Sequence, residues 1–346
     1  MSAVPPPNTV QPHAWFIACT ASKLGSRPLA VKVQGRVLVL FRDAEQKPVA
    51  LLDRCPHRNV PLSLGTVRHG ELECAYHGWR FDQTGACTHV PGLMTQDATL
   101  KSRCAEHHAT RELDGYLWVY STPNVTPTHE PFRFPHLETG GYSTVRREFQ
   151  VESSLHAAIE NTLDVPHTAF LHGGLFRTAE KTNVIDVVVR RHARHAEAEF
   201  HGEPAPRGLA GRVLAPGGGV VEHTDRFLLP SIAQVEYRLG TKSHLLVSTA
   251  FTPESDDFTR VYAVVTFTLP LPGWLVRPFV APIATRIFAQ DRVVLARQRE
   301  QVKTFGGERY TSTELDVLGP QVTLLIARAV QGVDAEPHEH RLQMRT

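Results

Sequence analysis

Two short segments near the start of the chain each combine a cysteine with a histidine. The first reads Cys-Pro-His-Arg, with one residue between Cys55 and His57. The second reads Cys-Ala-Tyr-His-Gly-Trp, with two residues between Cys74 and His77, and sixteen residues separate the two pairs. Two thiolates and two imidazoles suffice for one metal centre, either a structural zinc site or an iron–sulfur cluster.

The spacing within the pairs separates these two kinds of centre. Zinc sites usually take paired ligands two to four residues apart, often of the same kind. Here each pair is mixed, and only Pro56 lies between the first cysteine and histidine. Two mixed loops match a Rieske-type 2Fe–2S cluster, in which cysteines hold one iron and histidines the other. Imidazole ligands raise the reduction potential, so such a cluster accepts electrons.

A second group of candidate ligands lies at residues 160–172, which read Glu-Asn-Thr-Leu-Asp-Val-Pro-His-Thr-Ala-Phe-Leu-His. His167 and His172 follow the expected end of a helix, and Asp164 precedes His167 by three residues. Two imidazoles and one carboxylate form the facial triad of non-haem Fe(II) oxygenases, which leaves positions open for O2 and substrate. The carboxylate comes either from Asp164 or from elsewhere in the chain. An iron at such a site could accept the electrons that the first metal centre carries.

The hydrophobic pattern predicts the elements that must position these residues. Alternating strands dominate up to residue 121, with both ligand pairs on loops. Beyond a Pro-rich connection, we expect a helix over 154–164 capped by Ser153 or Ser154, a strand over 227–237 and a helix over 283–303. The fold class is α+β, with an N-terminal all-β domain and a C-terminal antiparallel sheet flanked by helices. The expected β-rich domain, connection, second domain and flexible tail span 13–121, 122–141, 142–332 and 333–346.

Composition excludes several classes of protein. The chain has 346 residues and 42% hydrophobic residues, which fits two globular domains. Its net charge of +2 is too small to indicate binding to nucleic acid or to a membrane surface. Four prolines and Arg277 interrupt the apolar run over 262–284, so we expect a strand, a bend and a buried helix start there and no membrane span. Three scattered cysteines outside the pairs and an N-terminus without signal-peptide features favour a cytoplasmic protein.

The combined pattern resembles the Rieske non-haem iron oxygenases over nearly the whole chain. It comprises Cys-x-His, sixteen residues, Cys-x2-His, a Pro-rich connection and then the motif Glu160-Asn161-x2-Asp164-x2-His167-x4-His172. The length is similar to that of the homotrimeric demethylase and monooxygenase branch. The resemblance implies one cluster iron on the two cysteines and the other on the two histidines. It also implies a mononuclear Fe(II) on His167 and His172.

The resemblance also assigns roles to acidic and amide residues. The remaining iron ligand of the family is an Asp on a late helix, where this chain has Asp291, although the sequence leaves Glu300 and a local role for Asp164 open. Asp164 resembles the acid that bridges an iron-bound His to a cluster His of the neighbouring subunit, and Asn161 belongs to the same catalytic motif. The residues beside the cluster ligands are expected to pack around the cluster: Arg58, Tyr76, Gly78 and Trp79.

The implied activity is that of a terminal oxygenase component in a homotrimer. An NAD(P)H-dependent reductase, directly or through a ferredoxin, would supply the electrons, because Pro216-Gly217-Gly218-Gly219 lacks the context of a dinucleotide site. O2 would then hydroxylate or oxidatively demethylate a small, apolar aromatic or polycyclic substrate. The alternatives are a Rieske-type desaturase, an electron-transfer protein without oxygenase activity and a zinc-containing binding module.

Overall fold

The structure is a computed structural model, and it describes these stretches of the chain: residues 11–94, 101–172, 183–203, 221–240 and 243–345. The chain forms two compact units. The N-terminal unit is Gln11–Arg133 with Thr252–Ser255, and the C-terminal unit is Phe134–Phe251 with the residues from Asp256 onward. No helix in the described stretches is long and apolar enough to cross a membrane.

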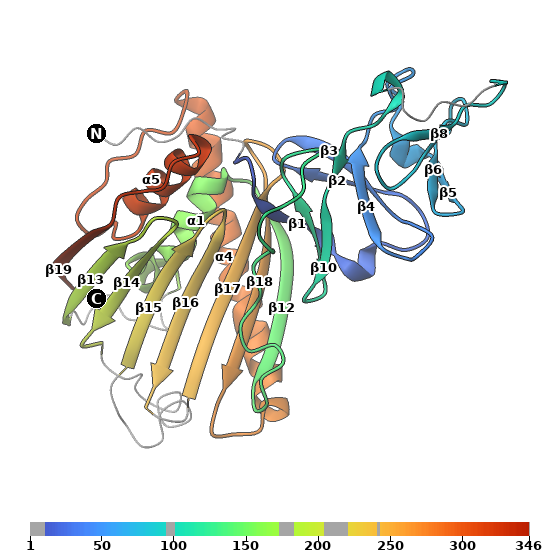
Figure 1. The fold of residues 1–346 in the computed structure, drawn as a ribbon. Coiled ribbons are helices and arrows are strands. Elements are labelled where there is room, and N and C mark those ends of the chain that lie inside the picture. Colours follow the sequence, from blue (N-terminus) through green and yellow to red (C-terminus); the bar gives the residue numbers. More distant parts are fainter. Residues whose placement is uncertain (1–10, 95–100, 173–182, 204–220, 241–242, 346) are drawn as a thin grey trace. The chain divides into compact units, whose positions relative to one another are not determined.

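The N-terminal unit consists of short strands in three sheets, with the strand orders β1-β11-β10, β2-β3-β4-β9 and β5-β6-β7-β8 (Figure 1). The predicted all-β domain is thus confirmed. One apolar cluster of this unit includes Phe41, Leu72 and Phe81 together with the buried Cys55 and Cys74. The strands are β1 (Trp15–Thr20), β2 (Leu29–Val33), β3 (Arg36–Arg42), β4 (Pro48–Leu52), β5 (Thr66–Arg68), β6 (Glu71–Glu73), β7 (Arg80–Phe81), β8 (Cys87–His89), β9 (His107–His108), β10 (Thr110–Leu113) and β11 (Tyr116–Tyr120).

The C-terminal unit is built on one antiparallel sheet of eight described strands, in the order β12-β18-β17-β16-β15-β14-β13-β19. Together with its helices, this sheet confirms the predicted α+β class. The strands are β12 (Ser143–Val151), β13 (Val184–Arg191), β14 (His195–His201), β15 (Val221–Leu228), β16 (Ile232–Leu239), β17 (Ser243–Pro253), β18 (Thr259–Thr268) and β19 (His338–Arg345). The helices are α1 (Leu155–Leu163), α2 (His167–Leu171), α4 (Gly273–Thr304) and α5 (Gly319–Val330).

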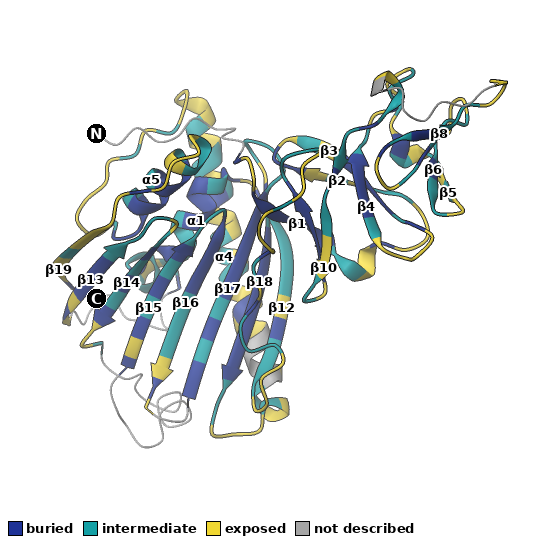
Figure 2. Ribbon diagram, viewed as in Figure 1, coloured by how far each residue is buried: buried dark blue, intermediate teal, exposed yellow. Residues whose placement is uncertain are grey.

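The helices of this unit pack against one face of the sheet. Ile159 of α1 and Leu325 of α5 share an apolar cluster with Val187, Phe200 and Phe227 of the strands. The three strand residues lie on the same face, because successive side chains of a strand alternate between faces and these positions are in register. Helix α1 contacts β15 and β16, α5 contacts β14, and α4 contacts β12. Figure 2 shows that much of the sheet is buried.

The predicted strand over 227–237 is wrong, because the chain turns within it. Strand β15 ends at Leu228 and β16 begins at Ile232. The turn contains Pro230, which lacks the N–H needed for a ladder hydrogen bond. The helix predicted over 283–303 begins earlier than expected, because α4 starts at Gly273. The buried helix start predicted within 262–284 is wrong, since Trp274 is 74% exposed.

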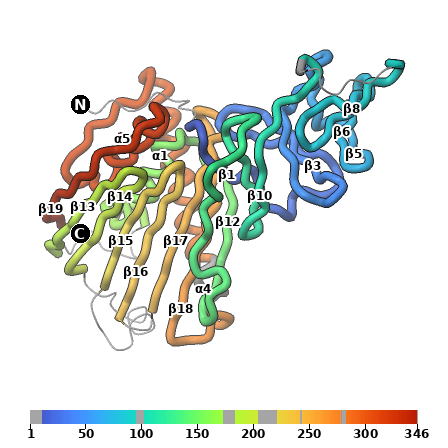
Figure 3. The backbone as a smooth tube through the Cα atoms, viewed as in Figure 1, coloured from blue at the N-terminus to red at the C-terminus, as the bar shows by residue number. Residues whose placement is uncertain are grey.

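The flexible tail predicted for 333–346 is wrong for most of its length. Residues His338–Arg345 form β19, which pairs antiparallel with β13 and lies beside it in Figure 3. Met344 is buried opposite Ile185, and the partly buried Leu342 packs against the same apolar cluster. Leu342 and Met344 alternate with polar or charged residues, as expected for a strand with one buried face. The polar overall composition of this segment led to the wrong prediction of a flexible tail.

A buried histidine with two acidic partners lies on the helix-facing side of the sheet. His223 of β15 is stacked between the rings of Phe200 and Tyr237, at centroid distances of 4.4 and 4.1 Å. Its Nδ1 lies 3.1 Å from Oε1 of Glu203, and its Nε2 lies 2.9 Å from Oδ1 of Asp225. Burial lowers the pKa of His223, but the two carboxylates outweigh it and raise the pKa to about 9. His223 is therefore a buried cation at neutral pH.

This cation makes the stability of the C-terminal unit depend on pH. The folded-state pKa of His223 lies above its ordinary value of 6.5, so its contribution is complete below about pH 6.5 and is lost as pH rises through about 9. His223→Gln should lower the free energy of unfolding by about 3–5 kcal/mol at neutral pH, because two buried carboxylates lose their cation. Urea unfolding at a series of pH values measures both effects.

The matched control for this substitution is His192→Gln, which changes a half-exposed histidine of the same sheet region. It should leave the pH dependence unchanged. An undiminished loss of stability between pH 6.5 and 9 in His223→Gln would show that another group causes it.

Candidate functional site

Two loops with the same backbone pattern carry the cysteine–histidine pairs. The N–H of Asn59 donates to the carbonyl of Cys55 at 2.9 Å, and the N–H of Gly78 donates to the carbonyl of Cys74 at 3.0 Å. Each cysteine N–H also donates to the carbonyl five residues further on, at 2.9 and 2.8 Å. Asn59 and Gly78 both have positive φ, 59° and 68°. Equivalent turns thus present the two pairs in equivalent ways.

The four side chains of these loops converge as a metal cluster requires. Cys55 and Cys74 are both buried and their thiols interact, and the ring centroids of His57 and His77 lie 4.5 Å apart. Burial raises the pKa of Cys55 to about 11, to which Cys74 contributes. Nδ1 of His57 is buried and has no hydrogen-bond partner among the described residues. A bound metal would supply both the missing partner and the positive charge that favours thiolates, so this donor set fits a cluster.

Aromatic rings flank the two histidines. His57 stacks on Trp79 with a centroid distance of 4.7 Å and an interplanar angle of 3°. The ring centroid of His77 lies 3.9 Å from that of Tyr76, a residue that is 61% exposed. His77 itself is exposed in the N-terminal unit. One edge of the site is thus held by packing, and the other reaches the surface of the unit.

The second candidate site forms where α1, α2 and α4 meet. Ser154 caps α1, as predicted, and its Oγ accepts a hydrogen bond from the N–H of Ala157 at 3.2 Å. The chain leaves α1 at Leu163 and starts α2 at His167, immediately after Pro166. This places His167, at the start of α2, and His172, directly after its end, near α4.

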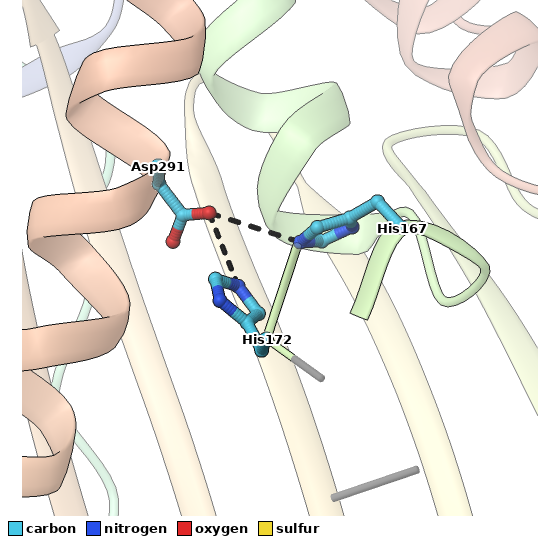
Figure 4. Close-up of side chains that lie close together, drawn as sticks. All are labelled: His167, His172 and Asp291. Carbon is cyan, nitrogen blue, oxygen red and sulfur yellow. Dashed lines mark ion pairs between the residues drawn. The ribbon is translucent and has the colours of Figure 1, made fainter. Parts of the chain in front are cut away.

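The structure brings His167, His172 and Asp291 together (Figure 4). Oδ1 of Asp291 lies 3.2 Å from Nε2 of His172 and 3.8 Å from Nε2 of His167. The three candidate ligand atoms all lie within 4.8 Å of one another. The other open candidate, Glu300, lies elsewhere: its side chain is 59% exposed and forms an ion pair with Arg297 at 2.9 Å.

Hydrogen bonds at the opposite ring nitrogens orient both histidines. Nδ1–H of His167 donates to the carbonyl oxygen of Asp164, and the same nitrogen lies 3.5 Å from the Asp164 carboxylate. Nδ1–H of His172 donates to Oε1 of Gln290 at 3.0 Å. Donation from Nδ1 leaves Nε2 of the neutral ring with a free lone pair, which is the arrangement that metal-binding histidines usually show.

The electrostatics of this site also fit a cation. Burial raises the pKa of Asp291, against the lowering effects of His172, His167 and a hydrogen bond from Asn161. Oδ1 of Asp291 is buried and accepts no hydrogen bond of good geometry from the described residues. Burial lowers the pKa of His167, but its interactions with Asp164 and Asp291 outweigh burial and raise it. The carboxylate of Asp291 and the free Nε2 lone pairs of His167 and His172 therefore converge on one position that could hold a cation.

The sequence does not reveal two of the contacts that build this site. Gln290 orients His172, and only its place directly before Asp291 on α4 could have suggested such a role. Asn161 was assigned to the site through its motif, but its hydrogen bond to Asp291 is visible only in the structure. Both contacts join residues that lie far apart in the sequence, so no local spacing rule indicates them.

Comparison with known proteins agrees with this arrangement. Residues 14–105 match the Rieske [2Fe-2S] domain, and residues 151–331 match the vanillate O-demethylase oxygenase C-terminal domain. The vanillate O-demethylase oxygenase subunit of Pseudomonas sp. (strain HR199 / DSM 7063) is 25% identical over 343 residues, which cover 91% of this chain and 94% of that protein. Protein TIC 55 of Arabidopsis thaliana is 27% identical over 79% of this chain, and the match spans 50% of its own length.

A solved structure shares the fold along almost the whole chain. Pseudomonas putida CBB5 NdmA with caffeine superposes with a TM-score of 0.74 at 22% sequence identity, covering 94% of this chain and 96% of that one. The C-terminal domain match takes up more than half of the 346 residues and follows the Rieske domain. The chain therefore belongs to the Rieske oxygenases, the family of oxidoreductases that the sequence pattern resembles, and is a terminal oxygenase component of that family.

Proposed function

We propose that this oxygenase takes electrons from an NAD(P)H-dependent reductase, directly or through a ferredoxin, and uses O2 to hydroxylate or oxidatively demethylate a small apolar substrate. The observation that carries the proposal is the convergence of His167, His172 and Asp291 in the unit that follows the Rieske domain. An electron-accepting cluster alone would need no such site. Oxidative demethylation is supported by the match to a vanillate O-demethylase subunit along nearly all of the chain.

The proposed ligands follow from the side chains that converge. Cys55 and Cys74 would hold one iron of the 2Fe–2S cluster, and His57 and His77 the other. A mononuclear Fe(II) on His167, His172 and Asp291 would supply open coordination positions for O2 and substrate. The chain's own part is to fix the ligand geometry, because Asp164 and Gln290 set the tautomers of the two histidines and Asn161 holds the Asp291 carboxylate.

The proposed aromatic or polycyclic substrate is supported by an aromatic pair close to Asp291 along α4. Phe288 lies on α4 three residues before Asp291, and its ring packs 4.9 Å from that of Phe149 on β12. Aromatic side chains one helical turn from Asp291 would favour an apolar substrate, which gains free energy by leaving water. Product analysis with a surrogate reductase distinguishes hydroxylation and demethylation from desaturation.

We also propose a cytoplasmic homotrimer, in which electrons pass from the cluster of one subunit to the iron of the next. The exposure of Tyr76 and His77 supports this arrangement, because it leaves the cluster edge open to a second protein surface. Asp164 would connect His167 to the neighbour's cluster histidine. The proposed domain boundaries are 13–121 for the Rieske domain and 142 onward for the catalytic domain, which β19 extends beyond residue 332.

Iron counting with a reduced-state EPR spectrum tests the proposed function. We expect about three irons per chain and the signal of a reduced Rieske cluster. About two irons per chain with the same signal would indicate an electron-transfer protein without oxygenase activity. A colourless protein that contains zinc would contradict both cluster and oxygenase.

Asp291→Ala should remove the mononuclear iron, because the proposed site loses its carboxylate ligand. We expect iron affinity at that site to fall at least about tenfold, while the visible spectrum of the cluster persists. The matched control is Glu300→Ala, which removes an exposed carboxylate from the same helix and should retain all iron. Full iron retention in Asp291→Ala would show that another residue provides the carboxylate ligand.

Asp164→Asn should leave both metal centres loaded and slow electron delivery between them by about 10- to 100-fold, because it alters the partner of an iron-bound histidine. Stopped-flow oxidation of the reduced cluster in a single turnover measures this rate. Asp334→Asn, which changes an exposed acid of the same unit, should behave as the wild type. A normal rate in Asp164→Asn would rule out the bridging role.

A further inference from the structure

The first half of α4 exposes a row of apolar side chains. Leu275 and Pro282 are exposed seven residues apart, and the exposed Pro278 and Ile283 flank them. Because an α-helix has 3.6 residues per turn, these four side chains lie on one side of α4. The exposed Trp274 adjoins them at the start of the helix. These five residues together are called the α4 face below.

The α4 face points away from the sheet and from the proposed iron site. The side of α4 that packs inward carries the buried Ala284 and Leu295 and also Phe288, which packs on an aromatic ring of β12. These three positions lie about half a turn around the helix from Leu275. The α4 face therefore belongs neither to the apolar core of the unit nor to the site at Asp291.

The charge around the α4 face has one sign. Residues 258–290 contain three arginines and neither aspartate nor glutamate. Arg286 is exposed and lies on the same side of α4 as Leu275, eleven residues before it. A helical ion pair would form with a residue three or four positions away, and none of these neighbours is acidic: Pro282, Ile283, Ala289 and Gln290. The net charge of the whole chain, +2, conceals this local excess of positive charge.

This combination of properties selects one kind of partner. A contiguous exposed apolar patch commonly marks an interaction surface. A two-fold contact between copies of the chain would bring the same surface from both together, so the two Arg286 side chains would repel each other. An anionic lipid bilayer complements both properties, because its interior accepts apolar side chains and its headgroups attract arginine. Tryptophan is also enriched at the boundary between headgroups and hydrocarbon, and Trp274 is exposed at the start of this face.

We propose that the α4 face binds the surface of an anionic lipid bilayer, with Trp274 and Leu275 inserted among the headgroups and Arg286 beside their negative charges. The contact is peripheral, since no helix in the described stretches could cross a membrane. It goes beyond the proposed function and requires neither metal centre. The outcome of its test is therefore independent of whether the iron site is as proposed.

Co-sedimentation of the full-length protein with lipid vesicles tests the proposal. The protein should bind vesicles of phosphatidylcholine mixed with phosphatidylglycerol, and bind vesicles of phosphatidylcholine alone at least about fivefold more weakly. Added salt should weaken the binding, because it screens the attraction between arginine and the anionic headgroups. Absence of binding to the mixed vesicles at low salt would overturn the proposal, as would equal binding to both kinds of vesicle.

Two pairs of variants locate the contact. Leu275→Ser should lower the affinity for mixed vesicles by about fivefold, because it removes apolar surface that leaves water on binding. Its matched control is Leu315→Ser, since both leucines are 44% exposed and Leu315 lies outside α4. Arg286→Gln should also lower the affinity by about fivefold, whereas Arg341→Gln, which removes an exposed arginine of β19, should leave it unchanged. Equal effects of a variant and its control would overturn the proposal.

Tryptophan fluorescence reports insertion directly. Trp15 and Trp118 are buried and Trp79 stacks on His57, whereas Trp274 is exposed. On addition of mixed vesicles the emission should shift to shorter wavelength, and brominated phosphatidylcholine should quench it. Trp274→Phe should still bind but lose both the shift and the quenching. Quenching that persists in Trp274→Phe would show that another part of the chain enters the bilayer, and would overturn the proposal.

A mass measurement distinguishes bilayer binding from contact between copies of the chain. Size-exclusion chromatography with light scattering, in the absence of lipid, should give the same mass for the wild type and for Leu275→Ser. A smaller mass for Leu275→Ser would show that the α4 face is an interface between subunits, and would overturn the proposal.

Discussion

The packing of α1 onto the sheet is the constraint on which the C-terminal unit depends. Ala158, Ile159 and Leu163 are buried against the strands and α5, and each large aliphatic side chain so buried contributes about 1.5–3 kcal/mol. The end of this helix then fixes where α2 begins. Because the two histidines follow within a few residues, the packing of α1 also determines where their rings meet α4.

The two candidate metal centres differ in how much of the fold is needed to form them. The cysteine–histidine loops are local structures, and each needs only a left-handed residue and two backbone hydrogen bonds to present its ligands. The site at His167, His172 and Asp291 instead needs two helices from distant parts of the chain. Small movements of α4 relative to α1 would change its geometry, whereas the loops would retain theirs. The hydrogen bonds of Asp164 and Gln290 compensate by limiting ring rotation.

This difference explains how much the sequence could predict. The paired ligands were predictable because their spacing is local, and the cap at Ser154 and the helix after it follow from residue types within one turn. Asp291 was selected through family resemblance, since no local pattern distinguishes it from Glu300. The break at Pro230 and the strand β19 were missed, because apolar runs and polar composition do not show which backbone pairs with which.

The pairing of β19 with β13 also has a consequence for solubility. Strand β13 carries three consecutive valines, Val187, Val188 and Val189, and an uncovered strand of this kind offers its backbone to other chains. β19 covers that strand and places mostly charged and polar side chains at the new border of the sheet, including Glu339 and Arg341. Strand β19 thus protects β13 from pairing with other chains, and removing residues His338–Arg345 would expose an aggregation-prone strand edge.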